Sequence, residues 1–390
     1  MRTQVGIVGA GPAGLLLAHL LRRDGIESVI LENRSRQYVI ERVRAGLLEQ
    51  GTVDLMTELG LADRLHREGL VHHGLALRFG GKSHRIPLTD LTGKVVTIYG
   101  QNEVMKDLID AHLDAGGEIL FEAEAEALTN LETTPGIRFR CNGEETVLAC
   151  DFVAGCDGFH GMCRPAIPDS ALTVYDREYP FAWIGILSES PPVSDELIYV
   201  HHERGFALFT MRSPMLSRLY LQCTPDDDIA DWPDARIWEE LHLRLGHVDS
   251  ELIEGNVTQK AITPMRSFVV APMRYGRLFI TGDAAHIVPP TGAKGLNLAA
   301  ADVRVLARAF GEHYRHGRSD LLDRYSEICL RRVWKSQRFS WWMTSMLHRF
   351  DDQSRFDRQV QLAELDYVTG SRAAMTALAE NYVGLPFEEL

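Results

Sequence analysis

The stretch that decides the fold is Val5-Gly-Ile-Val-Gly9-Ala-Gly11-Pro-Ala-Gly14, followed at once by Leu15-Leu-Leu-Ala-His-Leu-Leu-Arg-Arg23. It predicts a short apolar strand, a glycine-rich turn and then a helix. Gly25 ends the helix, and Ser28-Val-Ile-Leu-Glu32 predicts the next strand. A strand, a helix and a second strand packed into about 30 residues form a βαβ unit. The chain is therefore expected to begin with an α/β domain built on a parallel sheet.

The glycine-rich turn has the spacing that binds the pyrophosphate of a dinucleotide. Gly9 permits the tight turn, Gly11 lets a pyrophosphate approach the backbone, and Gly14 lets the helix and strand pack closely. The helix N-terminus offers its unpaired N–H groups to phosphates. Glu32, 18 residues after Gly14, can bind the ribose hydroxyls. A tight turn without a ligand is the alternative, but strand, helix and acid stand in register. The motif predicts a dinucleotide without distinguishing FAD from NAD.

The rest of the pattern divides the chain into three parts. A helix is predicted over 103–115, with strands over 118–127, 137–141 and 147–154. Beyond residue 175, strand-like runs separated by polar turns predict a mostly antiparallel sheet, over 181–187, 196–200, 205–210 and 218–222. A strand follows at 277–281, and the pattern is helical from Leu298 to about Leu347. We predict an FAD- or NAD-binding domain of residues 1–175 completed by 266–300, a β-rich substrate domain of 176–265, and a helical C-terminal region of 301–390.

Composition limits the partners and the location. The net charge of −13 argues against nucleic acid, because phosphate binding needs a concentrated basic face. Six cysteines fit neither a zinc spacing nor a CxxC redox pair, so free thiols in a reducing cytosol are expected. The apolar run from Val5 to Leu21 is nearly as long as a membrane span, but glycines and a proline interrupt it. His201-His202 lacks further ligands at metal spacing. We expect a cytoplasmic protein that binds no metal and inserts in no membrane.

Two further motifs follow predicted strands. The first is Arg277-Leu-Phe-Ile-Thr-Gly-Asp283, after which a loop rich in proline and glycine leads into a helix at Asn297. An aspartate in that place can accept a hydrogen bond from a ribitol hydroxyl. The second is Ala154-Gly-Cys-Asp157-Gly-Phe-His160-Gly161, which also ends a strand. Taken alone, either motif could be a structural turn.

Taken with the glycine-rich turn, these motifs make the chain resemble the flavoprotein aromatic hydroxylases. In that family the Gly-Asp motif faces the flavin, and the Asp-Gly motif lies between the FAD and nicotinamide sites. The resemblance spans essentially the whole chain. Stretches such as Val288-Pro-Pro-Thr-Gly-Ala-Lys294 and Glu380-Asn-Tyr-Val-Gly-Leu-Pro386 resemble the members that hydroxylate 4-hydroxybenzoate. The resemblance implies an α/β (α+β) fold with a Rossmann-like FAD-binding domain. It also implies a catabolic reaction in which FAD, NAD(P)H and O₂ add a hydroxyl beside the phenol, the flavin carrying an electrophilic oxygen donor.

The resemblance implies functional residues, carried over position by position. The residues implied to bind FAD are Gly9, Gly11, Gly14, Glu32, Arg42, Arg44, Gln101, Asp157, Asp283 and Asn297. Those implied to line the aromatic substrate are Tyr199, Thr210, Arg212, Tyr220, Pro290 and Tyr382. Arg212 would pair with the substrate carboxylate, because a guanidinium matches a carboxylate with two parallel hydrogen bonds. The implied catalytic residues form a proton relay from the substrate phenol through Tyr199 and Tyr382 to His72, whose pKa near neutrality suits proton release.

The chain departs from the family pattern in two places. Thr210 stands where the family has a serine, so the hydroxyl is kept while a methyl group tightens the pocket. The segment from Asn33 to Tyr38, where the family selects its nicotinamide, differs from the pattern of strict NADPH use. The residues expected at the nicotinamide site are Arg34, Tyr38, Arg42, His160 and Arg266. Positive charge there favours NADPH as co-substrate, with NADH still possible.

Structural roles remain open for several of these side chains. A lone arginine in a strand is commonly solvated, tyrosines in apolar alternation commonly pack in a core, and His72 falls in a probable loop. Alternative functions are hydroxylation of another phenolic acid, or a flavoprotein that does not hydroxylate, such as a reductase, a dehydrogenase or a sensor. The lack of a cysteine pair after the βαβ unit counts against a disulfide reductase. A cluster of large apolar residues in the C-terminal region favours a homodimer: Trp334, Phe339, Trp341, Trp342 and Phe350.

Overall fold

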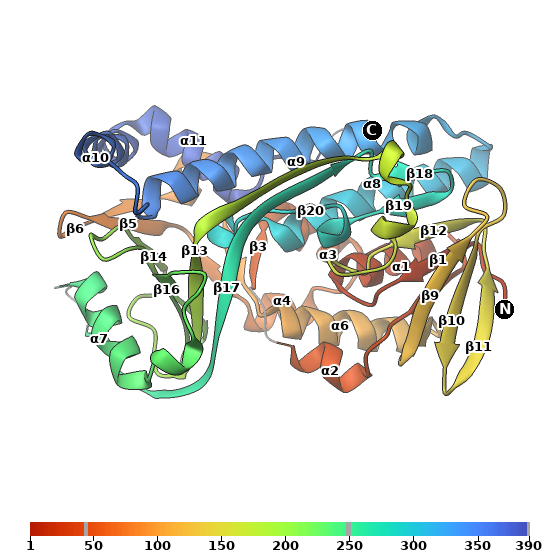
Figure 1. Ribbon diagram of the computed structural model, residues 1–390, viewed down its shortest axis with the longest axis horizontal. Helices are drawn as coiled ribbons and strands as arrows, with labels where there is room; N and C mark the ends of the chain where they lie inside the picture. The colour runs from red at the N-terminus through yellow and green to blue at the C-terminus, as the bar shows by residue number, and fades with distance from the viewer. Residues whose placement is uncertain (43–45, 247–250, 388–390) are drawn as a thin grey trace.

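The computed structural model describes residues 1–42, 46–246 and 251–387, and it is built around a parallel sheet and a long antiparallel sheet (Figure 1). The parallel sheet has the strand order β18-β19-β12-β1-β2-β8. Its strands are β1 (Val5–Val8), β2 (Ser28–Leu31), β8 (Glu118–Leu120), β12 (Phe152–Gly155), β18 (Arg274–Tyr275) and β19 (Leu278–Ile280). The pairs from β8 to β19 are parallel, and β18 closes the edge antiparallel to β19. The predicted α/β class is confirmed.

The first βαβ unit forms as its residues predict. Helix α1 (Pro12–Arg23) begins at Pro12, three residues before the predicted start, because proline suits the first helical position, where no N–H is needed. Arg22 and Arg23 stand in the last turn, where the helix dipole favours positive charge. The helix packs against α8 (Gly295–His316) and α6 (Gln101–Asp114). The glycine-rich turn is thereby fixed at the carboxyl end of β1, next to the end of β12.

The antiparallel sheet has the order β20-β17-β13-β16-β15-β14-β5-β6. Its strands are β5 (Leu75–Phe79), β6 (Lys82–Ile86), β13 (Thr173–Glu189), β14 (Leu197–Val200), β15 (Ala207–Ser213), β16 (Leu216–Cys223), β17 (Asn256–Ala271) and β20 (His286–Ile287). β13 and β17 are much longer than the predicted strands and run side by side toward the parallel sheet (Figure 1). Each strand has a largely exposed stretch, residues 173–178 in β13 and 256–264 in β17, and these stretches lie at opposite ends of the pair. Backbone pairing rather than apolar burial holds them, so an apolar pattern could not reveal them.

Strands β5 and β6 join this sheet from the N-terminal part of the chain, inside the segment predicted to belong to the first domain. β14 pairs with β5 in parallel, with Leu197 opposite Leu75. A parallel pair needs a long crossover, which leaves no local turn signal in the sequence. The division into domains stays a prediction.

Smaller sheets complete the β structure. β9 (Ala123–Thr129), β10 (Gly136–Cys141) and β11 (Glu144–Ala149) form one, and β3 (Leu47–Glu49), β7 (Val96–Ile98) and β4 (Leu70–His72) form another. His72 therefore ends a strand, opposite Val96, and its side chain is buried. The prediction of a loop at this histidine is wrong, because a three-residue strand gives too short an apolar pattern to recognise.

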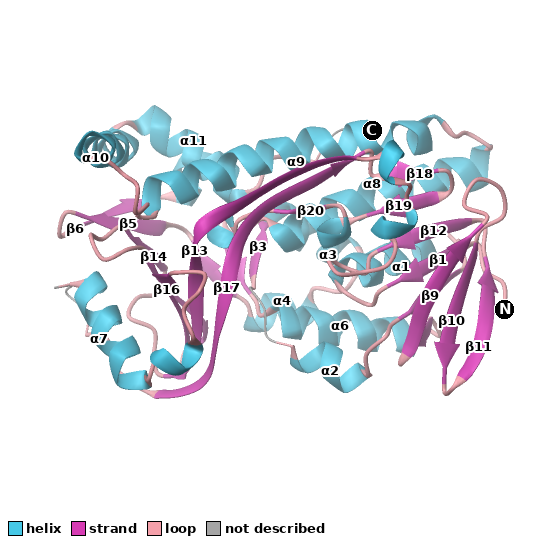
Figure 2. Ribbon diagram, in the orientation of Figure 1, coloured by secondary structure: helices cyan, strands magenta, loops and turns pink. Residues whose placement is uncertain are grey.

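The predicted helical stretch from 298 to 347 consists of α8 and α9 (Asp320–Leu347), which Gly317 separates with a left-handed φ of 65°. Figure 2 shows α8 and α9 running along the same long side of the molecule. The other helices are α2 (Arg36–Glu41), α3 (Gln50–Glu58), α4 (Asp63–Glu68), α5 (Leu88–Thr92), α7 (Asp234–Leu245), α10 (Arg355–Gly370) and α11 (Arg372–Val383). Within the described ranges, every helix is too short or too polar to cross a bilayer. An apolar core joins α9 and α11 to the antiparallel sheet, and Tyr199 and Tyr382 are part of it.

Candidate active site

The glycine-rich turn is a close-packed cradle that only glycine fits. A Cβ on Gly14 would lie 2.0 Å from the carbonyl oxygen of Gly9, and a Cβ on Gly9 would lie 2.5 Å from that of Cys156. Gly9 has a φ of 101°, which side chains other than hydrogen rarely adopt. Gly11, by contrast, faces only one backbone atom, 4.0 Å away, so its surface is open to a ligand. The turn therefore fits the pyrophosphate of FAD.

Glu32 lies at the end of β2 and is buried beside this turn. Its Oε2 accepts a hydrogen bond from the backbone N–H of Ala10 at 2.8 Å, and its Oε1 accepts one from the backbone N–H of Arg34 at 2.9 Å. The carboxylate is thus held in place by the backbone of the turn itself. That position matches the acidic residue expected to bind a ribose.

The Gly-Asp motif forms a short 3-10 turn, η4 (Gly282–Ala284), directly after β19. The backbone N–H of Gly282 donates to Oδ2 of Asp302 on α8 at 3.0 Å, and the same oxygen lies 2.7 Å from Nε2 of His286. Burial opposes a charge on His286, but the carboxylate of Asp302 outweighs it and raises the pKa of that histidine. This buried pair fixes the turn that presents Asp283, which is half-buried.

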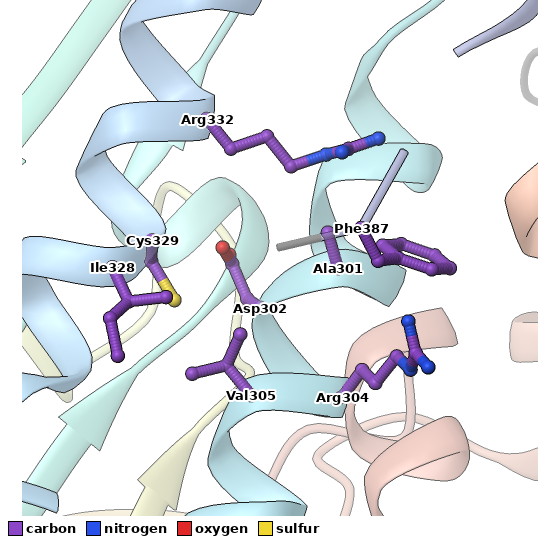
Figure 3. A pocket seen from close by; sticks show the side chains of 8 residues that line it. All are labelled: Ala301, Asp302, Arg304, Val305, Ile328, Cys329, Arg332 and Phe387. Carbon is purple, nitrogen blue, oxygen red and sulfur yellow. The ribbon is translucent and has the colours of Figure 1, made fainter. Parts of the chain in front are cut away.

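A small pocket lies next to Asp302, between α8 and α9 (Figure 3). One side of the pocket is lined by Arg304, Arg332 and Phe387, and the opposite side by Ile328 and Cys329. Within the described ranges, none of the side chains implied to bind FAD or substrate lines this pocket. The pocket is therefore separate from those expected site residues.

Asn297 and Gln101 open helices near the cofactor turn. The side chain of Asn297 is saturated by protein contacts: it accepts from Glu49 N and Thr52 Oγ1 and donates to the carbonyls of Leu47 and Ala293. Its expected contact with FAD therefore falls to its backbone N–H, in the first turn of α8. Gln101 is the first residue of α6 and is half-buried. The expectation at Arg44 lies outside the described residues.

The Asp-Gly motif is a compact turn after β12. Oδ2 of Asp157 accepts from the backbone N–H of Cys163 at 2.8 Å, while its Oδ1 is buried without a hydrogen-bond partner in the described part of the chain. Burial raises the pKa of this carboxyl. Arg164 lies over the rings of Phe159 and Phe268, 4.6 and 4.8 Å from their centroids. The role of Asp157 toward a cofactor stays a prediction.

The residues expected at the nicotinamide site divide into two groups. Arg34 lies over the ring of Tyr38, 5.2 Å from its centroid, and both are exposed, as is Arg42. In the second group, Arg266 pairs with Asp176 through an Nε–Oδ1 contact of 2.7 Å and lies 4.8 Å from the ring centroid of Phe159. His160 is exposed and its ring contacts Phe159. The guanidinium of Arg266 is thus neutralised by a carboxylate, whereas Arg34 and Arg42 remain on an open surface.

The residues predicted to bind a carboxylate come together on adjacent strands. Thr210 and Arg212 lie on β15, and Tyr220 lies on the adjacent strand β16. The register between these strands shifts at Arg212, between Met211 and Ser213. Oγ1 of Thr210 and Nε of Arg212 are buried, and neither finds a hydrogen-bond partner among the residues described. Burial lowers the pKa of Arg212, but an arginine remains charged at neutral pH. A half-buried arginine and a buried hydroxyl, each with unused hydrogen-bonding capacity, together fit an anionic ligand.

We call the group of Thr210, Arg212 and Tyr220 the carboxylate corner. Arg218, which was not predicted from the sequence, adds a second cation to it. Its Nε donates to the hydroxyl of Tyr220 at 3.2 Å. Burial alone would raise the pKa of Tyr220, but Arg218 and Arg212 together lower it. Alternation along β16 places Arg218 and Tyr220 on the same face, and that spacing was the available signal.

The predicted tyrosine pair is hydrogen-bonded. The hydroxyls of Tyr199 on β14 and Tyr382 on α11 lie 2.7 Å apart, although 183 residues separate them in sequence. Tyr199 also donates to the carbonyl of Thr291 at 3.2 Å, in the turn η5 (Pro290–Gly292). Burial raises the pKa of both hydroxyls above the ordinary value. Pro290 opens the same turn and is exposed, as a residue facing a ligand would be.

His72 is buried, with a side chain only 1% exposed. Its two ring nitrogens are without a hydrogen-bond partner in the described ranges. Burial lowers the pKa of His72 to about 4, with Glu196 acting in the opposite direction. The imidazole is therefore neutral at neutral pH, and its pKa departs from the near-neutral value expected from the sequence. The link from Tyr382 to His72 remains a prediction.

Lys294, the last residue of the stretch Val288–Lys294, is a further functional candidate. It is buried, and its Nζ donates to Oε1 of Glu49 at 2.6 Å, to the carbonyl of Tyr382 at 3.2 Å and to that of Asn381. Burial lowers the pKa of this amine, and Glu49 opposes that effect. The lysine ties the start of α8 to the end of α11. It therefore fixes Tyr382 relative to the cofactor side.

Comparison with known proteins adds independent information. Residues 2–340 match the family described as FAD binding domain. The chain is 51% identical over 390 residues to p-hydroxybenzoate hydroxylase of Acinetobacter baylyi, covering 100% of this chain and 96% of that protein. It is 27% identical to 6-hydroxy-3-succinoylpyridine 3-monooxygenase HspB of Pseudomonas putida, covering 83% of each chain. Among solved structures, p-nitrophenol 4-monooxygenase PnpA from Pseudomonas putida DLL-E4 superimposes with a TM-score of 0.85 at 21% identity, covering 99% of both chains.

Proposed function

The chain belongs to the FAD binding domain family of flavoprotein hydroxylases, and from this membership we propose that it hydroxylates 4-hydroxybenzoate to 3,4-dihydroxybenzoate. The reaction consumes NAD(P)H, a proton and O₂; one oxygen atom enters the ring and the other leaves as water. FAD, when bound, supplies the redox and oxygen-transfer chemistry. The glycine cradle, Glu32 and Asp283 would hold it. The observation that carries the substrate class is the buried corner of Thr210 and Arg212, whose unpartnered polar atoms suit a carboxylate.

Substrate orientation follows from the two ends of the site. The guanidinium of Arg212 pairs with the carboxylate, and the hydroxyls of Thr210 and Tyr220 add hydrogen bonds to it. At the other end the phenol meets the hydroxyl of Tyr199. Because Tyr199 is hydrogen-bonded to Tyr382, a proton leaving the phenol can pass along the pair without opening the site to water. His72, neutral in its buried position, is the acceptor proposed beyond them.

The nicotinamide proposal is NADPH, with NADH as the alternative. Arg34 and Arg42 lie exposed just beyond the first βαβ unit, where their charge can attract a 2′-phosphate. Arg36, a third cation there, is paired with Asp110 at 2.5 Å. Catalytic efficiency with each cofactor tests this, and a large preference for NADH would remove these arginines from the nicotinamide site.

We further propose a cytoplasmic homodimer. Six free cysteines suit a reducing compartment. Of the apolar residues expected at a dimer contact, Trp334 and Trp341 are exposed, while Phe339 is fully buried in the core and Trp342 and Phe350 are half-buried. Phe356, Val360 and Tyr367 add exposed apolar surface on α10. Sedimentation at micromolar concentration tests the dimer, and a monomeric mass would overturn it.

One assay separates the candidate functions. Purified protein loaded with FAD should oxidise NAD(P)H faster when 4-hydroxybenzoate is added, and 3,4-dihydroxybenzoate should accumulate. Stimulation by a different phenolic acid alone would indicate another substrate. Oxidation that no phenolic acid stimulates would overturn the hydroxylase proposal and favour a reductase or a sensor.

A further inference from the structure

A buried histidine at the C-terminal end of α9, His348, is held by two hydrogen bonds that define its tautomer. Its Nε2 lies 2.7 Å from the indole Nε1 of Trp183, and its Nδ1 lies 3.0 Å from the carbonyl oxygen of Thr344. An indole nitrogen only donates and a carbonyl only accepts, so Nε2 is the acceptor and Nδ1 carries the hydrogen. The side chain is 0% exposed, and burial lowers its pKa to about 3. The ring is therefore neutral and fixed in one orientation.

Aromatic neighbours enclose the same ring. Phe206 and Phe181 stack on it, with centroids 4.4 and 4.6 Å away, and Trp183 lies nearly parallel at an interplanar angle of 9°. All three neighbours are buried. The imidazole is thus held in one position, and its acceptor nitrogen, Nε2, is directed at the indole N–H of Trp183.

Trp183 in turn forms part of the wall of the carboxylate corner. Its ring centroid lies 5.0 Å from that of Tyr220, across strands β13 and β16. Gln222 is the residue opposite Trp183, and Gly185 is the residue opposite Tyr220. Trp183 and Tyr220 are therefore diagonal neighbours on one face of the sheet. A Cβ on Gly185 would lie 2.7 Å from the Arg218 guanidinium and 3.3 Å from the Tyr220 ring, so the glycine lets both side chains pack closely against the strand.

The backbone beside His348 is fixed by other contacts. The amide of Gln222 donates to the carbonyl of Arg349 at 2.6 Å and accepts from the N–H of Arg349 at 3.1 Å. His201 contacts the carbonyl of Leu347 at 3.2 Å. The end of α9 is thus docked on the sheet without help from the imidazole, and a change of that ring alone should leave the fold intact.

We propose that His348 is a positioning residue for the substrate carboxylate: by accepting the indole N–H it holds Trp183 against Tyr220, and so holds the Tyr220 hydroxyl beside Arg212. The inference rests on the proposed function, because it takes the corner of Arg212 and Tyr220 as the carboxylate site. It assigns His348 no contact with the substrate. Its effect is expected in substrate binding and not in the maximal rate.

The test is a double-mutant cycle in the FAD-loaded protein. His348→Phe keeps a flat ring but leaves the buried indole N–H without its acceptor, and Trp183→Phe removes the donor. Each should raise the dissociation constant of 4-hydroxybenzoate by about tenfold, the loss typical of one buried hydrogen bond. The double variant should bind no more weakly than the weaker single variant, because both changes break one interaction. In His348→Phe, kcat at saturating substrate should stay within about twofold.

The matched control is His313→Phe, the same substitution of a half-buried histidine whose ring lies 5.1 Å from Phe152, in the parallel-sheet region. Its substrate affinity should equal that of wild type. An unchanged dissociation constant in His348→Phe would overturn the inference, as would single effects that multiply in the double variant. If His348→Phe does not fold, Trp183→Phe alone tests the inference. An unchanged dissociation constant in Trp183→Phe would then overturn the inference. Failure of the unaltered protein to bind 4-hydroxybenzoate would instead overturn the proposed function.

Discussion

The cofactor side and the substrate side of this molecule differ in how far their buried polar side chains are already hydrogen-bonded within the protein. At the cofactor side, Glu32 and Asn297 have side chains already bonded to the backbone, and the ligand-facing surface is mainly backbone in the glycine turn. At the substrate side, Thr210, Arg212 and His72 bury side-chain atoms that lack a partner within the described residues. The cofactor side has one exception, Oδ1 of Asp157, which also lacks a hydrogen-bond partner in the described ranges. The substrate side leaves more hydrogen-bonding capacity for a ligand to use.

This difference has a physical reason. A pyrophosphate can be bound by backbone N–H groups at a helix start, so the chain need only shape its backbone and use side chains to hold that shape. An aromatic acid must be recognised at a carboxylate and at a phenol, and those groups need side chains aimed inward. A buried polar atom without a partner costs about 1–3 kcal/mol. A ligand that bonds to Thr210 and Arg212 would reduce this cost.

The largest expected effect lies at the cofactor side. In Gly14→Ala the new Cβ would meet the Gly9 carbonyl at 2.0 Å, and backbone cannot move aside cheaply. The variant should lose FAD, measured as the flavin absorbance that remains with the protein after gel filtration. Gly370→Ala, where nothing lies within 4 Å of the new Cβ, is the control and should retain FAD. Normal flavin content in Gly14→Ala would show that the cradle is not the pyrophosphate site.

The next largest effect lies at the substrate side. Arg212→Ala should keep FAD and weaken 4-hydroxybenzoate binding by roughly 2–5 kcal/mol, the usual loss for a buried charge pair. Equilibrium titration of the flavin absorbance measures it. Arg140→Ala removes a half-exposed arginine that pairs with Glu126 on β9, and should bind the substrate like wild type. If Arg212→Ala bound with unchanged affinity, the carboxylate would lie elsewhere.

The hydrogen-bonded tyrosine pair predicts an effect on product yield. Tyr199→Phe removes one hydroxyl and with it the contacts to Tyr382 and Thr291. Substrate should still bind and NAD(P)H should still be consumed, but much of the O₂ should appear as hydrogen peroxide because the phenol is no longer activated. Quantifying 3,4-dihydroxybenzoate against NAD(P)H measures the yield. A yield and rate equal to those of wild type would contradict the relay.

The smallest effect concerns pH and refines the comparison. Among the described residues, two buried histidines, His72 and His112, have ring nitrogens without a hydrogen-bond partner. Burial lowers the pKa of His72, at the substrate side, and of His112, on α6, from 6.5 to about 4. Between those values the unfolded chain binds a proton that the folded chain does not, so stability falls as pH falls from 6.5 to 4. Each histidine adds a slope of up to about 1.4 kcal/mol per pH unit.

Urea unfolding at pH 7, 6 and 5 measures these slopes. His112→Gln and His72→Gln should each reduce the loss of stability on acidification. Only His72→Gln should also lower the yield of hydroxylated product, because only that histidine is proposed to take the substrate proton. Equal product yields in the two variants would remove His72 from the relay.

The sequence predicted the cofactor side more completely than the substrate side. The turn at Gly9–Gly14 and the acid at Glu32 are local in sequence, and local sterics and hydrogen bonding dictate their geometry. Tyr199 and Tyr382 meet across 183 residues, so only the resemblance to a family could bring them together in advance. The buried state of His72 and the saturated side chain of Asn297 depend on packing between distant segments. The same is true of Lys294 and His348, whose surroundings come from several elements each.

The most direct test of the account is an experimental structure of the FAD-loaded protein with 4-hydroxybenzoate bound. We expect the carboxylate within hydrogen-bonding distance of Arg212 Nε and Thr210 Oγ1, two buried atoms without a partner in the part of the chain that the structure describes. The phenol oxygen should lie against the hydroxyl of Tyr199. A ligand in the reverse orientation, or one bound away from β15 and β16, would contradict it.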